Sequence, residues 1–243
     1  MIHYHGMAGA GTTEDMVSLV KGRHCFVSYA AHSKLPLFAS MCSSFALDNG
    51  AFTAWKQGKS FDMAGFTEFV KEWMQHPAFD WAVMPDVIDG TEQENDALLE
   101  EWTLPKHIGV PVYHMHESME RLERLIDNYD YICLGSSGEY SQPNSKIWWK
   151  RMNEIMDVAT DDNGKAKVRM HGLRMLNRKV FTRLPLKSAD STNAERNGLL
   201  VERFGMYPPP SRGQRAVVIA DRVENEQSAS TWMTPEQLEL QLT

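Results

Sequence analysis

Acidic and histidine side chains follow several short apolar runs in this 243-residue sequence. Asp48, Asp86 and Asp190 each come at the end of such a run, and His114 and His116 follow another. Carboxylates held in different environments can divide the work of catalysis, one as a nucleophile and another as a proton donor. If the runs are parallel strands of one barrel, their carboxyl ends meet, and we expect these five side chains to lie close together.

Each of these residues also has a structural interpretation. Asp is favoured at turns and helix starts, so Asp48 and Asp190, taken singly, can be explained as caps. His114 and His116 share a face only if the strand continues through both, and two ligands do not complete a metal site. We therefore expect no bound metal and no organic cofactor.

The apolar runs alternate with stretches of helical periodicity, a pattern that predicts βα units and a parallel sheet. Seven strands are expected, at residues 24–29, 44–48, 81–86, 110–114, 131–135, 168–173 and 184–190. Helices are expected between them at residues 61–74, 91–102, 118–128 and 147–160. The fold class predicted is an α/β protein, a TIM (β/α)8-type barrel formed by a single domain.

The closure of this barrel depends on an eighth strand, which we expect at residues 216–220, after the turn-rich segment 207–213. The core of the domain would then span about residues 24–220 of the 243. Near the end of the chain, Thr234, Pro235 and Glu236 predict the start of a last short helix.

Basic charge is concentrated in one segment. Residues 1–140 carry 9 Lys and Arg against 20 Asp and Glu, whereas residues 141–190 carry 11 against 5. The net charge of −7 for the whole chain argues against a sequence-blind polyanion binder, since phosphate binding relies on basic side chains. The basic segment is either a nucleic-acid footprint or a solvated face, and its Trp148 and Trp149 either stack on a base or pack in a helix.

Cys25, Cys42 and Cys133 are odd in number, far apart and in apolar contexts. Neither a disulfide framework nor a zinc site is indicated, and we expect buried free thiols. No apolar run is long enough to cross a bilayer, and the first residues lack the order of a secretory signal. The expected location is the cytoplasm, with no membrane partner.

The segment Asp48-Asn49-Gly50-Ala51-Phe52 resembles the Asp-Ser-Gly-Gly-Phe/Tyr element of the tRNA-guanine transglycosylases. Asp86 matches the base-recognising aspartate of that family, and residues 135–139 resemble its glycine-containing recognition loop. Asp190, in Ser-Ala-Asp-Ser-Thr, matches the nucleophile and is most similar to that of the deazaguanine DNA-modification branch (DpdA), the DNA-guanine transglycosylases. The resemblance covers about residues 24–195.

The resemblance implies an enzyme that exchanges guanine in DNA for a free 7-deazaguanine of the preQ0 type, through a covalent aspartyl-deoxyribose intermediate. Asp190 would be the nucleophile, and Asp48 would protonate the departing guanine and later take a proton from the incoming base. The residues expected to bind the base are Asp86, Phe52, Asn49, Gly50, His114, Gly135, Ser136, Glu139 and His171. Those expected to bind the nucleic acid are Lys187, Arg174, Arg178 and Lys179.

Two features depart from the family pattern. The zinc-binding Cys/His cluster that follows the barrel in the bacterial and eukaryotic tRNA enzymes has no counterpart in this sequence, which favours DNA over tRNA as the acceptor. The strand-four glutamine of the family is replaced by His114 or His116, so the identity of the incoming base stays undetermined.

Three alternatives stay open. The first is the same exchange on tRNA, and the second is a non-catalytic partner subunit that docks nucleic acid or a catalytic homologue. The third is an unrelated TIM-barrel hydrolase that uses paired carboxylates on a sugar or a phosphoester. The sequence also leaves open whether the chain forms a homodimer.

Overall fold

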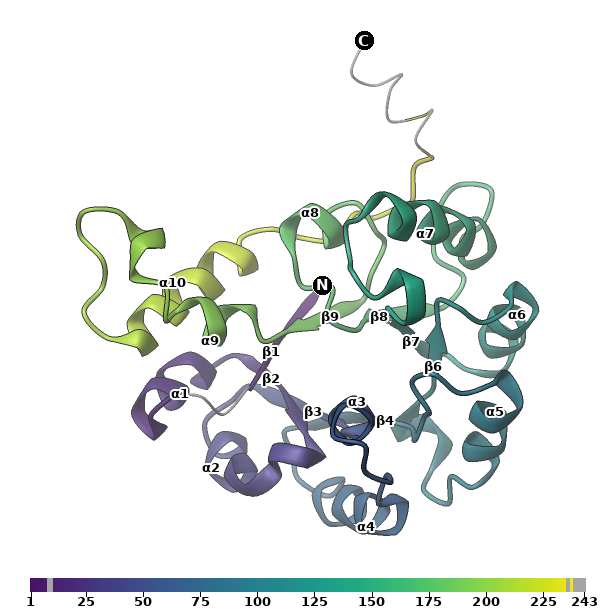
Figure 1. Ribbon diagram of the computed structural model, residues 1–243, viewed down its shortest axis with the longest axis horizontal. Helices are drawn as coiled ribbons and strands as arrows, with labels where there is room; N and C mark the ends of the chain where they lie inside the picture. The colour runs from purple at the N-terminus through teal and green to yellow at the C-terminus, as the bar shows by residue number, and fades with distance from the viewer. Residues whose placement is uncertain (8–10, 235–236, 238–243) are drawn as a thin grey trace.

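A computed structural model describes residues 1–7, 11–234 and 237, and within them nine parallel strands form one sheet, in the order β5-β4-β3-β2-β1-β9-β8-β7-β6. The strands are β1 (Ile2–Gly6), β2 (His24–Ser28), β3 (Ser44–Asp48), β4 (Phe79–Val83), β5 (Gly109–Val110), β6 (Val112–His114), β7 (Tyr131–Gly135), β8 (Arg169–Gly172) and β9 (Ser188–Ser191). Figure 1 shows that helices surround the strands. This arrangement is the one expected of alternating βα units.

The sheet closes into a barrel at Pro111, which separates β5 from β6. The amide of Met84, just after β4, donates to the carbonyl of Val110 at 2.9 Å, and the amide of Cys133 in β7 donates to the carbonyl of Pro111 at 2.8 Å. Proline has no N–H group, so the ladder is interrupted at this residue while its carbonyl still accepts. Because β5 and β6 are two halves of one extended segment, the described residues form an eight-stranded barrel, and the predicted TIM-type fold is confirmed.

The helices connect the strands in chain order. The α-helices are α1 (Thr13–Val20), α2 (Leu35–Ala39), α3 (Ala51–Lys56), α4 (Met63–Trp73), α5 (Glu92–Glu100), α6 (Met119–Asn128), α7 (Lys146–Ala159), α8 (Arg178–Phe181), α9 (Asn193–Asn197) and α10 (Arg212–Glu224). Short 3-10 turns are η1 (Tyr29–Lys34), η2 (Lys106–Ile108), η3 (Gly138–Tyr140) and η4 (Val201–Phe204). In Figure 1, α3 lies in front of the barrel opening.

The four helices predicted from periodicity are present as α4, α5, α6 and α7. Their starts follow the expected capping chemistry. The Ser118 side chain accepts from the Arg121 amide at 3.2 Å at the start of α6, and Thr91 forms a capping box with Glu94 at the start of α5.

The prediction of the eighth strand is wrong, because residues 216–220 belong to α10. A Ser211–Gln214 capping box starts that helix, and Ala216 and Ala220, one helical turn apart, are both buried. The strand that completes the barrel is instead β1, which pairs with β2 on one side and β9 on the other. The core therefore begins near residue 2, not near residue 24.

Strand β1 lies between the barrel interior and α10. The Tyr4 side chain points inward and is fully buried, whereas His3 and His5 alternate with it and point outward, His5 to α10 and His3 to the residues just after it. The Nε2 atom of His5 lies 2.7 Å from a carboxylate oxygen of Glu224. Polar histidines on the outer face of a buried strand hide the apolar signal that marks the other strands.

The barrel interior is filled by side chains from alternate strand positions, chiefly Tyr4, Phe26, Ala46, Trp81, Val83, Val110, Val112 and Cys133. Two larger apolar clusters pack between the strands and the surrounding helices. Because the interior is a packed core and not a pore, ligands can approach polar groups only at the barrel ends.

The thiols of Cys25, Cys42 and Cys133 are free, as predicted, although Cys42 is only partly buried. Thr234 and Gln237 are described and exchange hydrogen bonds, but Pro235 and Glu236 of the expected last helix lie outside the described residues. Every helix in the described ranges is too short or too polar to cross a bilayer.

Candidate active site

The carboxyl ends of the strands bring the three predicted carboxylates together. Asp48 is the last residue of β3, Asp190 lies in β9, and Asp86 follows β4. The charges of Asp190 and Asp86 both act on Asp48, so the three groups share one electrostatic environment. The sequence prediction that these residues converge at one barrel end is therefore met by their positions.

The environment of Asp48 favours its protonated form. Burial raises the pKa of Asp48 to about 7, with the charges of Asp190 and Asp86 acting in the same direction and the Ser28 hydroxyl and Gly50 amide opposing it. At neutral pH, both the protonated and the ionised forms are therefore populated. A carboxyl group in this state can donate and then accept a proton.

The turn after Asp48 is built on Gly50. Gly50 has a φ of 81°, in the left-handed region, and a Cβ atom there would lie 3.1 Å from the backbone nitrogen of Ala30. This turn leads directly into α3, whose first amide, at Ala51, donates to the Asn49 side-chain oxygen at 2.8 Å. Gly50 thereby fixes where Asn49 and α3 lie relative to Asp48.

Both oxygens of Asp86 have neighbours. The Asn49 side-chain amide donates to Oδ1 of Asp86 at 2.6 Å and to the carbonyl of Met84 at 2.8 Å. On the other side, Nε2 of His114 lies 2.8 Å from Oδ2 of Asp86. Each carboxylate oxygen has a second lone pair, so Asp86 can still accept a hydrogen bond from a ligand.

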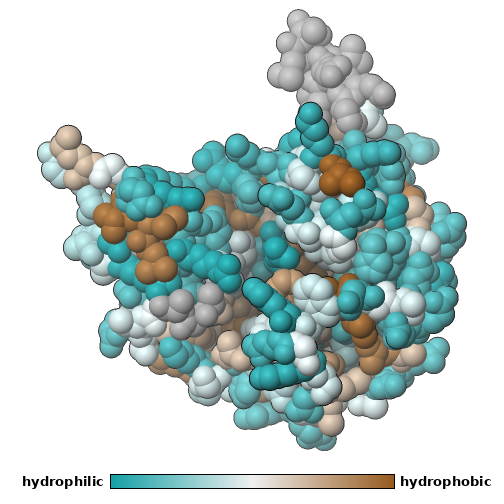
Figure 2. Space-filling view, in the orientation of Figure 1, coloured by the Kyte–Doolittle hydropathy of each residue, from teal (hydrophilic) through white to brown (hydrophobic). Residues whose placement is uncertain are grey.

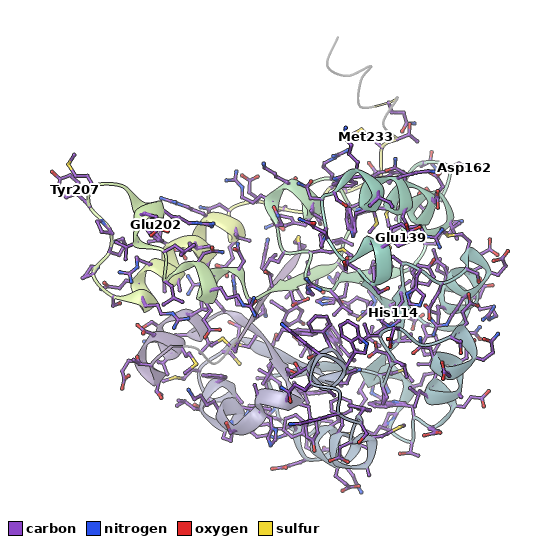
Figure 3. The ribbon with its side chains drawn as sticks, viewed as in Figure 1. His114, Glu139, Asp162, Glu202, Tyr207 and Met233 are labelled. Carbon is purple, nitrogen blue, oxygen red and sulfur yellow. The ribbon has the colours of Figure 1, made fainter. Side chains whose placement is uncertain are left out.

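His114 is almost fully buried at the end of β6. A Cβ atom on Gly135 would lie 3.1 Å from its Nδ1 atom, so glycine at this position leaves room for the ring. The ring also stacks on His116, with centroids 5.6 Å apart, while His116 contacts the Ser137 hydroxyl at 2.8 Å. In Figure 3, His114 lies close to the barrel axis.

Asp190 is held by backbone from the loop after β8. The Arg174 amide donates to Oδ1 of Asp190 at 2.7 Å, and the Leu176 amide donates to the carbonyl of Asp190 at 2.9 Å. Arg174 has a φ of 60°, an uncommon conformation for a residue with a side chain. Strained backbone of this kind is typical of functional sites.

The Arg174 side chain reaches across the mouth to α3. Its guanidinium carbon lies 5.2 Å from the centre of the Phe52 ring, within cation–π range. Phe52 and Trp55 are 41% and 48% exposed, and their ring centroids are 5.8 Å apart. An exposed aromatic pair beside a cation can stack on nucleobases.

Three expected ligand-binding residues lie differently from what their assigned roles require. His171 is fully buried and packs 4.8 Å from Trp81, below Asp190, where it cannot stack on a base. The Ser136 hydroxyl accepts from the Trp148 indole at 2.9 Å. Glu139 is exposed in η3, further from the barrel axis than His114 (Figure 3).

Of the four basic residues expected at the nucleic acid, Arg174 alone is shown beside the carboxylates. Lys187 precedes β9, and its carbonyl accepts from the Ile2 amide at 3.0 Å, at the amino-terminal end of the barrel. Arg178 and Lys179 are exposed on α8, and Arg178 forms an ion pair with Glu226. The basic segment is thus spread over several faces, and Lys187 lies at the end opposite Asp190.

The two tryptophans of that segment also differ from each other. Trp148 is fully buried in the core between α7 and the strands, which confirms its packing interpretation. Trp149 is partly buried, and the Arg183 guanidinium lies 4.0 Å from its ring centre.

Several polar residues near the site have no recognisable signal in the sequence. Ser28 ends β2 opposite Asp48, and Ser188 and Tyr131 contact each other at 2.5 Å below His171. Period-two alternation places Ser28 on the inner face, but serine is so common at strand ends that its position does not indicate a functional residue. In the described part of the chain, no group of three or more His, Cys, Asp or Glu is arranged to hold a metal ion.

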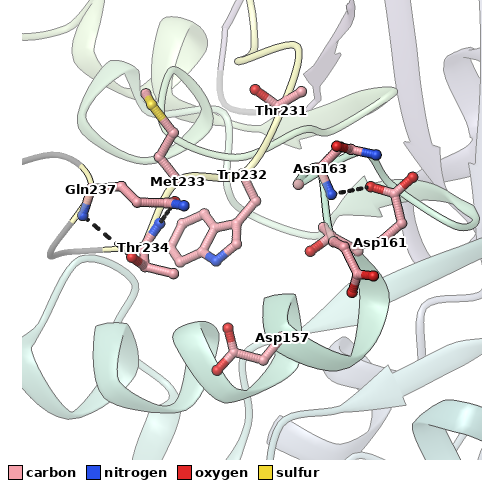
Figure 4. A pocket seen from close by; sticks show the side chains of 11 residues that line it. Asp157, Asp161, Asn163, Thr231, Trp232, Met233, Thr234 and Gln237 are labelled. Carbon is pink, nitrogen blue, oxygen red and sulfur yellow. Dashed lines mark hydrogen bonds between the residues drawn. The ribbon is translucent and has the colours of Figure 1, made fainter. Parts of the chain in front are cut away.

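Other surface features lie away from the carboxylates. A pocket of about 540 Å³ lies between the end of α7 and residues 231–234 and 237, and its polar walls include Asp157, Asp161 and Asn163 (Figure 4). A hydrophobic patch covers part of the segment between α9 and α10, which carries exposed Leu199 and Val201 (Figure 2). The carboxylates, the histidine pair and the aromatic pair remain the candidate active site.

Comparison with known proteins supports the fold. Neither a protein-family model nor a curated protein matches this sequence. A solved structure, described as a fructose-1,6-biphosphate aldolase from Coccidioides immitis, superposes with a TM-score of 0.57 at 11% sequence identity. The match covers 93% of this chain and 91% of that chain, so nearly the whole chain has the TIM-barrel fold. At this level of identity the likeness concerns the fold alone.

Proposed function

We propose that this chain is a base-exchange transglycosylase that replaces guanine in DNA with a free 7-deazaguanine of the preQ0 type. The observation that carries the proposal is the pairing of Asp48, whose pKa is raised to about 7, with Asp190 at one barrel mouth. Two carboxyl groups in different environments are what a double displacement at a sugar carbon needs.

In the first half of the reaction, a carboxylate oxygen of Asp190 attacks C1′ of the deoxyribose. The bond from C1′ to the guanine nitrogen breaks, and its electron pair leaves with the base. Asp48, in its protonated form, gives a proton to the departing guanine. The product is free guanine and an ester between Asp190 and the sugar.

In the second half, the ionised Asp48 takes a proton from the ring nitrogen of the incoming base. That nitrogen attacks C1′, and the bond from C1′ to Asp190 breaks, which returns the carboxylate. Asp48 ends protonated, as it began, so the cycle closes without a cofactor. Its pKa of about 7 suits both directions of proton transfer.

Base recognition is assigned to the other groups at the mouth. Asp86 would accept from the donor edge of the purine, while Asn49 and His114 hold its carboxylate in place. Phe52 would stack on the extruded base, and Arg174 would contact a phosphate beside it. Gly135 leaves space beside the His114 ring.

The test is incorporation of radiolabelled guanine into polymer. The purified protein is incubated with labelled guanine and either duplex DNA, single-stranded DNA or bulk tRNA, and polymer-bound label is counted. We expect label in DNA with the wild type and none with Asp190→Ala. Label in tRNA alone would replace DNA by tRNA as acceptor. No label in any polymer, with a folded protein, would contradict the exchange and favour the hydrolase or partner-subunit alternatives.

A further inference from the structure

Three polar side chains form a chain of contacts inside the barrel, directly below Asp190. The Tyr131 hydroxyl lies 2.5 Å from the Ser188 hydroxyl, which lies 2.5 Å from Nδ1 of His171. Nε2 of His171 then lies 3.4 Å from Oδ1 of Asp190. His171 and Ser188 are fully buried, so no bulk water competes for these contacts.

The order of the contacts fixes the direction of the hydrogen bonds. Nε2 of His171 faces a carboxylate, which can only accept when ionised, so the imidazole proton belongs on Nε2. Nδ1 then accepts a hydrogen bond from the Ser188 hydroxyl, and the Ser188 oxygen in turn accepts one from the Tyr131 hydroxyl. Each hydroxyl donates to the next group, and the hydrogen bonds end at His171, whose Nε2 atom faces Asp190.

The two oxygens of Asp190 are therefore not equivalent. Oδ1 receives the Arg174 amide at 2.7 Å and faces Nε2 of His171 at 3.4 Å. Among the described residues, Oδ2 receives no hydrogen bond from any donor. An oxygen that accepts a backbone hydrogen bond and faces an imidazole nitrogen is the weaker nucleophile, because its lone pairs are less available than those of Oδ2.

We propose that His171, held by Ser188 and Tyr131, is a positioning residue that fixes Asp190 through Oδ1 and leaves Oδ2 as the attacking oxygen. The kinetic consequence of this inference rests on the proposed function. The geometry around Asp190 is independent of that function. His171 does not touch substrate. It acts by restricting rotation of the carboxylate, which matters because small misplacements of a nucleophile slow reactions strongly.

The surroundings of His171 argue against a purely structural side chain. Its ring packs 4.8 Å from Trp81 and 5.2 Å from Phe26, in an aromatic layer that an apolar residue could fill at lower desolvation cost. Buried polar networks are costly unless each member is satisfied. In the described residues Nε2 of His171 forms no hydrogen bond, and Oδ1 of Asp190, 3.4 Å away, is the polar atom that faces it.

The first experiment measures the His171 tautomer in the wild-type protein, without substrate. Long-range ¹H–¹⁵N spectra distinguish a protonated from an unprotonated ring nitrogen, and His171→Gln identifies the signal. We expect the proton on Nε2 in wild type and a loss of this preference in Ser188→Ala. A proton on Nδ1 in wild type would overturn the inference, whether or not the chain has exchange activity.

The second experiment measures exchange kinetics for His171→Leu, His171→Gln and Tyr131→Phe. We expect kcat to fall by about 100-fold for His171→Leu with KM for the base unchanged, and to be largely rescued in His171→Gln, whose amide can donate near the Nε2 position. Tyr4→Phe is the matched control, because it removes a buried tyrosine hydroxyl that donates a hydrogen bond to Asp80 and not to Ser188.

The outcomes separate the two proposals. Equal loss in His171→Leu and His171→Gln, or a change in KM alone, would overturn a positioning role for His171. An equal effect of Tyr4→Phe and Tyr131→Phe would also overturn it, since the loss would then reflect general packing. A wild type with no exchange activity but with the Nε2 proton would contradict the proposed function and support the geometry around Asp190.

Discussion

Nε2 of His114 lies 2.8 Å from Oδ2 of Asp86, and both side chains are buried at the barrel mouth. Truncation of His114 removes this neighbour and leaves a buried carboxylate held by Asn49 alone. We expect His114→Ala to lower the free energy of unfolding by about 1–3 kcal/mol, because the buried carboxylate loses the polar neighbour that faces its Oδ2 atom. Urea unfolding at neutral pH measures it, with His116→Ala as the control. Equal losses in the two variants would show that the contact with Asp86 is not the cause.

Asp48 gives a pH dependence with a definite sign. Its folded-state pKa of about 7 lies above the unfolded value of about 3.9, so the folded state binds the proton more tightly. The contribution of Asp48 to stability is therefore greatest below about pH 4 and falls as the pH rises through 7. We expect the free energy of unfolding of Asp48→Asn, taken relative to that of the wild type, to be higher at pH 8 than at pH 5. A difference that does not change with pH would contradict the raised pKa.

Gly50 offers a test of the turn that carries Asp48 into α3. Gly50 and Gly58 both have positive φ values, of 81° and 63°, but a Cβ atom meets the backbone of Ala30 at Gly50 and open space at Gly58. Gly58→Ala measures conformational strain alone, about 1–2 kcal/mol, and Gly50→Ala should cost more. Thermal unfolding of the two variants compares them. Equal destabilisation by Gly50→Ala and Gly58→Ala would show that the backbone near Ala30 moves to admit the new Cβ atom at no cost.

The exposed aromatic pair on α3 should contribute to nucleic-acid affinity. Truncation of Phe52 or Trp55 removes a stacking surface beside Arg174, and each should weaken binding of single-stranded DNA by about 1–3 kcal/mol. Fluorescence anisotropy with a labelled oligonucleotide measures the affinity. Tyr207→Ala is the matched control, because Tyr207 is 87% exposed and lies far from the barrel mouth (Figure 3). A similar loss in the control would point to non-specific binding.

Much of the fold could be predicted from the sequence because most strands are apolar runs and most helices carry caps, such as Ser118 before α6. Strand β1 could not, since His3 and His5 point outward, to α10 and the residues just after it, and interrupt the apolar pattern of the strand. Residues 216–220 were misleading because a short apolar run fits a buried helix face as well as a strand.

The candidate site shows the same division. Asp48, Asp86 and Asp190 converge because each lies at or just after the carboxyl end of a parallel strand, which the order of the apolar runs predicts. The positions of His171 and Lys187 could not be predicted from motif order alone. Whether a side chain near a strand faces the mouth, the interior or the opposite end depends on the register of the strand. A shift of the register by one residue turns every side chain of the strand to the other face of the sheet.

The central claim is that Asp190 becomes covalently bonded to the sugar, and its most direct test is to trap that ester. The protein is incubated with a DNA substrate in the absence of a free base, denatured, digested and analysed by mass spectrometry. We predict a denaturation-resistant protein–DNA adduct on the peptide that contains Asp190, absent in Asp190→Asn and discharged by added 7-deazaguanine. An adduct that persists in Asp190→Asn, or base exchange by that variant at the wild-type rate, would contradict the account.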